Sequence, residues 1–536
     1  MRATAQAPAG RETHRPAAPG HGLGPVAGAG VPRWVVVAAL GVAALTLLPV
    51  VVVTARAVTT DPGAAADILL RPRLAELLGN TLTLVVLSGT ACLGLGIAAG
   101  WLVERTTLPL RGLWRLLLVA PLAVPAFVNA YAWVSLRPGT DGLVAAVGVT
   151  TLSYFPFVYL PVAAALRGLD PALEDSARAL GLGPVAVFGR VVLPQLRPAA
   201  LGGLLLVSLH LLAEFGALEL VRFPTFTVAI LQQYDTSFAG ATAELLALVL
   251  LVVTAGILLT EHLARGRARY ARLGPGSRRR AGVVPLGRWT VPALAGLGAL
   301  VVAALGVPLG SLARWLGAAP DAFSETASDA GALVPATLTT LGLAAAAAAV
   351  TLVAAFPVAW LVTRRQDRLA AAVERATYLA SSLPGVVVAL ALVTLTVRAV
   401  PVLYQSTTLL VVAYTVLFLP RAVVSLRAAL AQAPPELVDA ARALGVGYGG
   451  ALRRVLVPLA LPGALAGTAL VVVATATELT ATLLLAPTGT RTLATGFWAA
   501  SDSLDYAAAA PYAVVMVLLS VPLTWLLLRR PTEEAG

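Results

Sequence analysis

The stretch DSARALGLGPVAVFGRVVLP, residues 175–194, returns as DAARALGVGYGGALRRVLVP at residues 439–458, and this repetition decides the fold. Both stretches are polar and contain several glycines, whereas the segments on either side are long and apolar. Three residues recur at one constant offset, Asp175 as Asp439, Gly181 as Gly445 and Pro194 as Pro458. We therefore expect a duplicated chain whose halves each carry the stretch once.

The composition is that of a membrane protein. The 536 residues are 58% hydrophobic and 12% charged, with a mean hydropathy of +0.86, and a soluble protein could not bury so much apolar surface. Because exposed irregular backbone is not tolerated in lipid, each apolar block should be a helix. We predict an all-α polytopic protein with about twelve spans, at 34–55, 80–103, 113–135, 143–166, 199–221, 241–260, 289–312, 335–362, 376–399, 405–426, 461–485 and 508–529.

The distribution of arginine predicts the orientation. The net charge of +12 rests on arginine alone, because the sequence contains no lysine. Residues 261–288 hold eight arginines, whereas loops 136–142 and 222–240 hold one each. Basic residues gather in cytoplasmic loops, so both termini are expected in the cytoplasm. In an apolar chain this charge indicates topology and a lipid bilayer as partner, and no nucleic-acid binding is expected.

The repeat also predicts the division of the chain. Six spans return the chain to the side where it started, so the halves should be parallel, with a pseudo-twofold axis along the membrane normal. The expected units are a disordered cytoplasmic tail (1–32), a first repeat (33–260, core 80–260), a basic linker (261–288), a second repeat (289–530, core 336–525) and a C-terminal tail (531–536).

Each copy of the polar stretch predicts a short helix, a turn and a second helix. Asp175 suits a helix N-terminus, and Gly181 and Gly183 can end the helix in a left-handed turn. The apolar face, which includes Ala177 and Leu180, is expected to contact a partner. Two such surfaces related by a twofold axis favour a partner with twofold symmetry. The alternative is a pair of ordinary loops inherited by duplication.

The spacing resembles the EAA loop of bacterial ATP-binding cassette importer permeases. That pattern is an acid-Ala-Ala triplet, a glycine four residues later, and a final hydrophobic-x-hydrophobic-Pro. The matching residues are Asp175, Ala177, Gly181 and Pro194, and then Asp439, Ala441, Gly445 and Pro458. Ser176 replaces the first alanine of the first triplet, and both copies have Asp where Glu is usual.

This resemblance implies a fold, a location and partners. It implies the type I importer (MetI-like) permease fold in a bacterial inner membrane, with coupling helices that fit a dimer of separate ATPase subunits. It also implies a periplasmic or lipid-anchored substrate-binding protein. A phosphate-binding P-loop needs a lysine, which the sequence lacks, so we predict a transport subunit and no enzyme. This chain is expected to bind no cofactor, with ATP and Mg²⁺ on the partner ATPase.

The fused two-half layout reduces the number of substrates to be expected. The segments EFGALELVRFPTFTVAILQQYD (214–235) and TATELTATLLLAPTGTRTLATGFW (475–498) resemble the ferric-iron permeases. Thiamine permeases share the layout, so thiamine or another small solute stays an alternative. A proton-coupled secondary transporter is a further alternative, although it would have no need for a symmetric cytoplasmic docking surface.

Ionisable residues inside apolar segments give the candidate pathway. Glu214 and Glu478 occupy matching positions in the two halves, and His210 lies four residues before Glu214. Such groups are costly in a membrane, and carboxylates suit a hard cation. We expect them to line the pathway; the alternative is that they pair with arginines or lie at the periplasmic mouth. The histidines and the single cysteine have no metal-ligand spacing, so no certain metal site is predicted.

Overall fold

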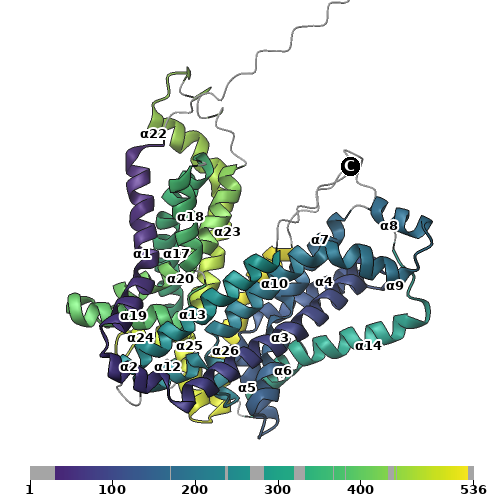
Figure 1. The fold of residues 1–536 in the computed structure, drawn as a ribbon, viewed down its shortest axis with the longest axis horizontal. Helices are drawn as coiled ribbons and strands as arrows, with labels where there is room; N and C mark the ends of the chain where they lie inside the picture. The colour runs from purple at the N-terminus through teal and green to yellow at the C-terminus, as the bar shows by residue number, and fades with distance from the viewer. Residues whose placement is uncertain are drawn as a thin grey trace, which may run out of the picture.

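The computed structural model describes residues 31–528 except 170, 236–239, 266–282, 319–331, 366, 381, 432–436, 438, 439 and 442 (Figure 1). Over these residues the chain is helical, with no strand and one isolated bridge between Thr106 and Val284. Asp439, most of the predicted tails and much of the basic linker lie outside the described residues.

The helices of the first half follow the order of the predicted spans. They are α1 (Arg33–Thr59), α2 (Pro62–Leu69), α3 (Pro72–Arg105), α4 (Arg111–Val119), the 3₁₀ turn η1 (Ala120–Ala123), α5 (Ala126–Leu136), α6 (Gly142–Tyr154), α7 (Pro156–Gly168), α8 (Pro171–Ala179), α9 (Pro184–Val187), the π turn η2 (Phe188–Val192), α10 (Leu193–Ala213), α11 (Gly216–Leu220), α12 (Phe226–Asp235) and α13 (Gly240–Arg265).

The second half repeats this order. Its elements are η3 (Gly287–Trp289), α14 (Thr290–Val301), the π turn η4 (Val302–Gly306), α15 (Val307–Ala318), α17 (Leu333–Arg364), α18 (Arg368–Ala380), α19 (Gly385–Ala399), η5 (Pro401–Leu403), α20 (Thr407–Ala431), α22 (Tyr448–Ala451), the π turn η6 (Leu452–Leu456), α23 (Val457–Ala476), α24 (Thr480–Leu485), α25 (Leu493–Asp502) and α26 (Tyr506–Leu528).

All twelve predicted spans coincide with helices, but the third span of each half is broken. Among the described residues, nine helices are long and apolar enough to cross a bilayer. The helices on either side of Val124 meet at 90° and make a tenth span if the pair is counted as one. Two shorter apolar helices, α19 and Tyr506–Pro522, occupy the remaining positions. Pro125 and Pro384 directly precede α5 and α19, where a proline cannot donate the hydrogen bond that would continue a helix.

The predicted spans 199–221 and 461–485 end earlier than expected. Helix α10 stops at Ala213 and α23 stops at Ala476, and the short helices α11 and α24 follow each break. Glu214 and Glu478 therefore lie at interruptions of the helical backbone, and the prediction that they lie within continuous spans is wrong. The reason is local capping, which is described below.

The internal repeat extends to irregular details of the backbone. Helix α9, the π turn η2 and α10 begin at residues 184, 188 and 193. Their counterparts α22, η6 and α23 begin at 448, 452 and 457, which keeps the offset of the repeated sequence. A π turn is a rare feature, so its recurrence at the matching position supports two halves with one fold.

The first long helix of each half packs on the opposite half. Helix α1 lies against α17, α18 and α19, and α15 lies against α5. In Figure 1 the helices form two groups that meet near α5, α12 and α25 and diverge toward α8 and α22. The crossing of α1 is secured by a polar contact: Arg56 Nε lies 3.1 Å from Glu244 Oε2, and the Thr394 hydroxyl donates to Glu244 Oε1 at 2.8 Å. These three residues join α1, α13 and α19.

Candidate functional site

The first copy of the repeated stretch forms the predicted helix and left-handed turn. Helix α8 ends at Ala179, and Gly181 has φ +85°. The Leu182 amide donates to the Ala177 carbonyl at 3.1 Å, and the Gly181 amide donates to the Arg178 carbonyl at 2.9 Å. These two bonds make a Schellman motif, which satisfies the last carbonyls of the helix.

The second copy ends in the same turn. Gly445 has φ +81°, and the Val446 amide donates to the Ala441 carbonyl at 3.0 Å. Ala441 and Val446 correspond to Ala177 and Leu182 at the offset of the repeat. A left-handed residue favours glycine because a Cβ would clash with the following carbonyl. The conformation therefore explains why glycine stands at both positions.

The two turns expose equivalent leucines to solvent. Leu180 and Leu444 directly precede the turn glycines, and each is 84% exposed. Ala177 is buried, so its side chain does not belong to the exposed face that the sequence predicted, and Leu180 carries that face. Asp175 is exposed on α8, which ends one residue before Leu180. Large apolar side chains held so far out of the protein are typical of contact surfaces.

Pro194 and Pro458 mark where each stretch re-enters a long helix. Each is the second residue of α10 or α23 and lies one residue beyond a π turn, η2 or η6, in an unbroken helical run. Proline cannot donate the amide hydrogen bond to the preceding turn, and irregular turns accompany such a loss. The predicted return toward the membrane at these residues therefore coincides with an irregular turn within a long helix.

Glu214 and Glu478 each cap the short helix that follows them. Glu214 Oε1 accepts the Ala217 amide at 2.9 Å, and Glu478 Oε1 accepts the Ala481 amide at 2.8 Å. A carboxylate at this position satisfies a free amide of the first turn and lies at the positive end of the helix dipole. The caps explain why both spans break here, although no proline stands at either break.

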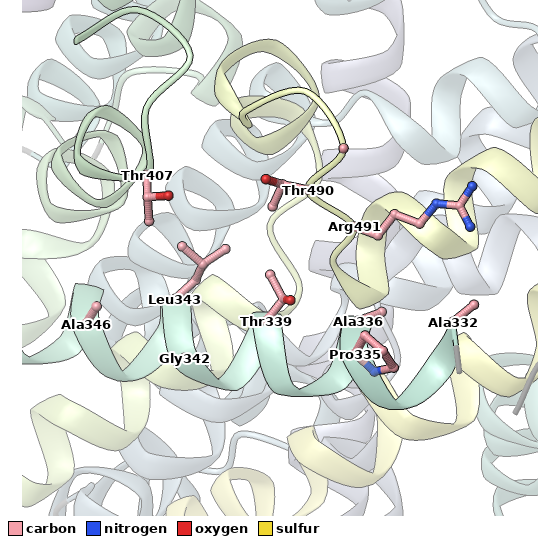
Figure 2. A pocket seen from close by; sticks show the side chains of 11 residues that line it. Ala332, Pro335, Ala336, Thr339, Gly342, Leu343, Ala346, Thr407, Thr490 and Arg491 are labelled. Carbon is pink, nitrogen blue, oxygen red and sulfur yellow. The ribbon is translucent and has the colours of Figure 1, made fainter. Parts of the chain in front are cut away.

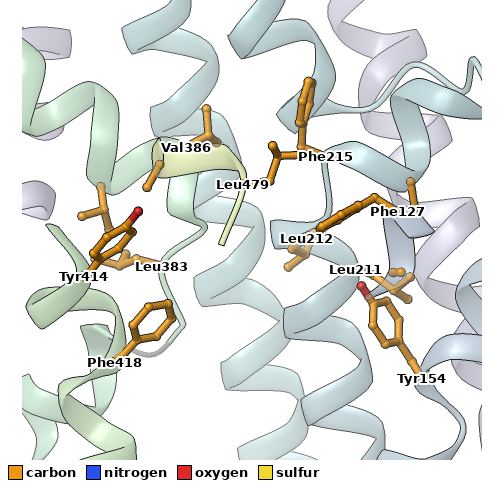
Figure 3. Close-up of a cluster of buried hydrophobic side chains, with 14 of the residues drawn as sticks. Phe127, Tyr154, Leu211, Leu212, Phe215, Leu383, Val386, Tyr414, Phe418 and Leu479 are labelled. Carbon is orange, nitrogen blue, oxygen red and sulfur yellow. The ribbon is translucent and has the colours of Figure 1, made fainter. Parts of the chain in front are cut away.

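The carboxylates differ in their second partner. The Tyr154 hydroxyl donates to Glu214 Oε2. The residue that corresponds to Tyr154 at the offset of the repeat is Phe418, which has no hydroxyl. One turn before it, Tyr414 bonds to the Thr482 hydroxyl at 2.7 Å, and Thr482 donates to the Glu478 carbonyl at 2.7 Å. Figure 3 shows both tyrosines beside the apolar cluster that joins the halves. The two glutamates are thus symmetric in backbone contacts and asymmetric in side-chain contacts.

His210 joins this site through aromatic contacts. Its ring lies 4.3 Å from the ring of Phe157 and 5.5 Å from that of Tyr154, measured between centroids. Its Nδ1 lies 2.8 Å from the Leu206 carbonyl oxygen within α10. His210 and Glu214 therefore meet through Tyr154, and not as two residues on one continuous helical face.

Arg421 of the second half completes the polar site. Its charge interacts with Glu478 and with His210, and Glu478 also interacts with Glu214, so groups from both halves share one electrostatic environment. The guanidinium lies 4.9 Å from the centre of the Phe418 ring. Sequence reasoning missed Arg421 and Tyr154, although an arginine directly after Pro420 within an apolar span was a usable signal.

An apolar contact joins the two halves close to both glutamates in the chain. A Cβ built on Gly216 would lie 2.9 Å from Leu479 Cδ2 and 2.9 Å from Phe127 Cβ. The ring centroids of Phe127 and Phe497 are 5.3 Å apart. Figure 3 shows Leu479 reaching toward Leu212, Phe215 and Phe127. We call Phe127, Gly216, Leu479 and Phe497 the inter-half seal. It directly adjoins Glu214 and Glu478 in the chain.

A separate hollow lies in the second half. It has a volume of about 730 Å³ and is lined by α17, the start of α20 and the loop that ends at Arg491 (Figure 2). None of the predicted site residues lines it. Within the described residues, no group of three or more His, Cys, Asp or Glu side chains is arranged to hold a metal ion.

Two halves with matching left-handed turns, apolar helices in the same order and a shared polar site define a duplicated polytopic membrane protein. The chain belongs to the family of binding-protein-dependent transport system inner membrane components, which matches it twice, over residues 93–269 and 351–529. The chain is 34% identical to the Fe(3+)-transport system permease protein FbpB 2 of Haemophilus influenzae, over 91% of this chain and 96% of that protein.

Two further relatives match about a third of this chain. The sulfate transport system permease protein CysW of Synechocystis sp. is 29% identical over 29% of this chain and 66% of its own length. The molybdenum transport system permease protein ModB of Escherichia coli is 28% identical over 33% of this chain and 88% of its own length. The duplicated family region and the helical architecture confirm the predicted fold class.

Proposed function

We propose that this chain is the permease subunit of a ferric-iron importer, inserted in a bacterial inner membrane with both termini in the cytoplasm. The substrate assignment is supported by the relative named for Fe(3+) transport, because the similarity covers both halves of both proteins. The relatives named for sulfate and molybdenum cover about a third of this chain. A periplasmic or lipid-anchored binding protein delivers the iron to the face opposite the coupling helices.

The coupling proposal rests on one observation, the matched pair of turns at Gly181 and Gly445. They present Leu180 and Leu444 with equal exposure, which suits two identical pockets on an ATPase dimer. The dimer binds ATP and Mg²⁺, and its closure pulls the two coupling helices together. Asp175 and Asp439 then supply the acidic groups of this contact, and Pro194 and Pro458 begin the helices that carry the movement into the membrane.

The iron pathway in this proposal runs between the halves. Glu214, Glu478 and His210 line it, together with Tyr154 and Arg421. Carboxylate and phenol oxygens suit a hard trivalent cation. Arg421 lowers the affinity of the site for cations, which keeps binding transient and lets the ion leave again. The seal at Leu479 separates this site from the opposite face until the two halves rearrange.

Matched glycine substitutions test the coupling surface. Gly181→Ala and Gly445→Ala place a Cβ on a left-handed residue, at a cost of roughly 1–2 kcal/mol each. Gly183→Ala and Gly447→Ala are the controls, because neither residue is left-handed and no atom lies within 4 Å of the added Cβ at any of the four positions. Only the backbone conformation then distinguishes the pairs.

We expect the double variant Gly181→Ala/Gly445→Ala to lose co-purification with the ATPase and uptake of iron-55, while the control pair keeps both. Gly445→Pro and Asp439→Arg should block association more strongly, since proline cannot adopt a positive φ. Insertion is checked by the amount of chain in the membrane fraction. Full association and uptake in all of these variants would refute the coupling proposal.

A further inference from the structure

A buried ion pair ties the first coupling helix to a membrane span. Arg105 is the last residue of α3, and its guanidinium contacts Glu174 of α8. Their side chains are 3% and 2% exposed. Two opposite charges so deeply buried hold each other in place, because separating them would leave an uncompensated charge inside the protein. The contact therefore fixes where α8 sits relative to α3.

Neighbouring groups extend this link to the exposed face of α8. Arg178 donates to Glu174 Oε2 at 3.1 Å with one nitrogen and to Asp175 Oδ1 at 3.0 Å with another. Arg178 is 41% exposed, so it bridges the buried carboxylate and the solvent-facing one. A displacement of the surface around Asp175 thus reaches Arg105 through three consecutive charged contacts, Asp175–Arg178, Arg178–Glu174 and Glu174–Arg105.

Aromatic packing supports the same junction from the other side. The Arg105 guanidinium lies 5.7 Å from the centre of the Trp101 ring. Trp101 in turn packs edge-on against Phe188, with centroids 4.6 Å apart. Phe188 begins the π turn that follows the coupling helix. The residue before the repeated stretch, Glu174, and a residue within it, Phe188, therefore both contact the C-terminal end of α3.

Helix α3 can carry a displacement across the whole protein. Its 34 residues span about 50 Å at 1.5 Å per residue. It packs against α7 and α10, and α10 ends directly before Glu214. A tilt imposed at Arg105 would therefore reach the region of the inter-half seal through two packed helices.

The second half lacks this carboxylate in its sequence. The residue that corresponds to Glu174 at the repeat offset is Val438. The arginine that corresponds to Arg105 is Arg364, the last residue of α17, because WLVTR (360–364) repeats WLVER (101–105). The second half therefore keeps the arginine at this helix end but has valine at the position of the carboxylate.

We propose that the Arg105–Glu174 pair is the link through which the first coupling helix moves α3, so that the two ATPase docking sites contribute unequally to transport. Glu174 and Arg105 act as positioning residues. This inference rests on the proposed coupling function, and it adds that docking and transmission of movement depend on different residues of α8.

The test separates these two steps in the complete complex. The full chain is purified with the ATPase that co-purifies with the wild type, and the complex is reconstituted in liposomes. Iron-55, supplied as ferric ion on the binding protein, and ATP hydrolysis are measured together. For Glu174→Gln we expect unchanged ATPase association and about a tenfold loss of iron transported per ATP, within the usual range of coupling between sites.

Two further variants make the result specific. Glu76→Gln is the matched control, because Glu76 pairs with Arg73 at the other end of α3 and both side chains are about half exposed. It should transport as the wild type does. The double variant Arg105→Met/Glu174→Met removes both buried charges and so avoids an unpaired one. It should fold and associate with the ATPase but show the same loss of iron per ATP.

The outcomes distinguish this inference from the proposed function. Glu174→Asp keeps the charge, so its ratio of iron transported per ATP should lie between those of the wild type and Glu174→Gln. If both Glu174→Gln and the double methionine variant keep the wild-type ratio, the link through Arg105 is refuted while docking stands. If Glu174→Gln abolishes ATPase association itself, Glu174 belongs to the docking surface and the separation of roles is wrong. If Gly181→Ala/Gly445→Ala leaves association intact, the docking proposal itself fails.

Discussion

Gly216 of the first half lies directly against Leu479 of the second, where an added Cβ would come within 2.9 Å of Leu479 Cδ2. Each of these residues lies one or two positions after a capping glutamate, Glu214 or Glu478. A close contact between the halves therefore adjoins the two carboxylates in the chain. Any separation of the halves at this point also alters the surroundings of both capped helices.

We predict that Gly216→Ala destabilises the closed seal. Overpacking of this kind costs about 1–3 kcal/mol, and Phe127 Cβ on the other side leaves little room for adjustment. Thermal unfolding in detergent measures the effect. Gly94→Ala is the control, because Gly94 is inside α3 with no atom within 4 Å of the added Cβ, and it should be neutral or stabilising. Adding Leu479→Ala to Gly216→Ala should recover part of the lost stability. Equal melting temperatures for Gly216→Ala and Gly94→Ala would contradict the close contact at the seal.

The capping glutamates should respond differently to loss of charge and loss of side chain. A glutamine can still accept the Ala481 amide, so Glu478→Gln should keep the fold and reduce iron-55 uptake. Glu478→Ala also removes the cap, at a cost of about 1 kcal/mol. Uptake in intact membranes and thermal unfolding separate the two effects. Wild-type uptake by Glu478→Gln at normal expression would remove Glu478 from the pathway.

The tyrosines provide an internal comparison. Tyr154 donates to the Glu214 carboxylate, whereas Tyr414 bonds to Thr482. We expect Tyr154→Phe to impair iron uptake more than Tyr414→Phe, because only the first leaves a carboxylate oxygen without its donor. Uptake at matched expression measures this difference. Equal effects would indicate that neither hydroxyl contributes through the carboxylate.

Glu244 should matter for stability rather than for the pathway. It is 5% exposed and accepts from Arg56 and Thr394 on two other helices. Glu244→Gln should lower the free energy of unfolding by about 2 kcal/mol, typical of a lost bond to a charged group. Glu76→Gln, which removes a charge from an exposed pair, should cost less than about 1 kcal/mol. Similar melting of the two variants would mean that the Arg56 contact adds nothing.

The single cysteine allows a direct test of orientation. Cys92 is buried, so Cys92→Ala should give a functional background without reactive thiols. In that background, Ala179→Cys in α8 should react with a membrane-impermeant maleimide only from the cytoplasmic side. Val402→Cys, at a position 84% exposed in η5, should react only from the periplasmic side. Labelling of both positions from one side would overturn the proposed topology.

The sequence predicts features that depend on local backbone requirements. Gly181 and Gly445 were recognisable because a left-handed turn needs glycine, and the twelve spans because lipid imposes apolar blocks of fixed length. The helix breaks after Ala213 and Ala476 could not be recognised in the sequence, because each depends on whether the glutamate side chain folds back to accept a backbone amide. Tyr154 and Glu214 are 60 residues apart, so their contact arises only from helix packing. The same holds for Arg105 and Glu174.

The crossing of α1 onto the second half has a consequence for biosynthesis. Its packing surface on α17, α18 and α19 does not exist until the ribosome has added more than half of the chain. At about 5–20 residues per second, this delay is on the order of tens of seconds. During that interval α1 is a newly inserted helix surrounded by lipid. The two halves of the fused chain therefore cannot fold one after the other, and α1 is among the last spans to pack in its final position.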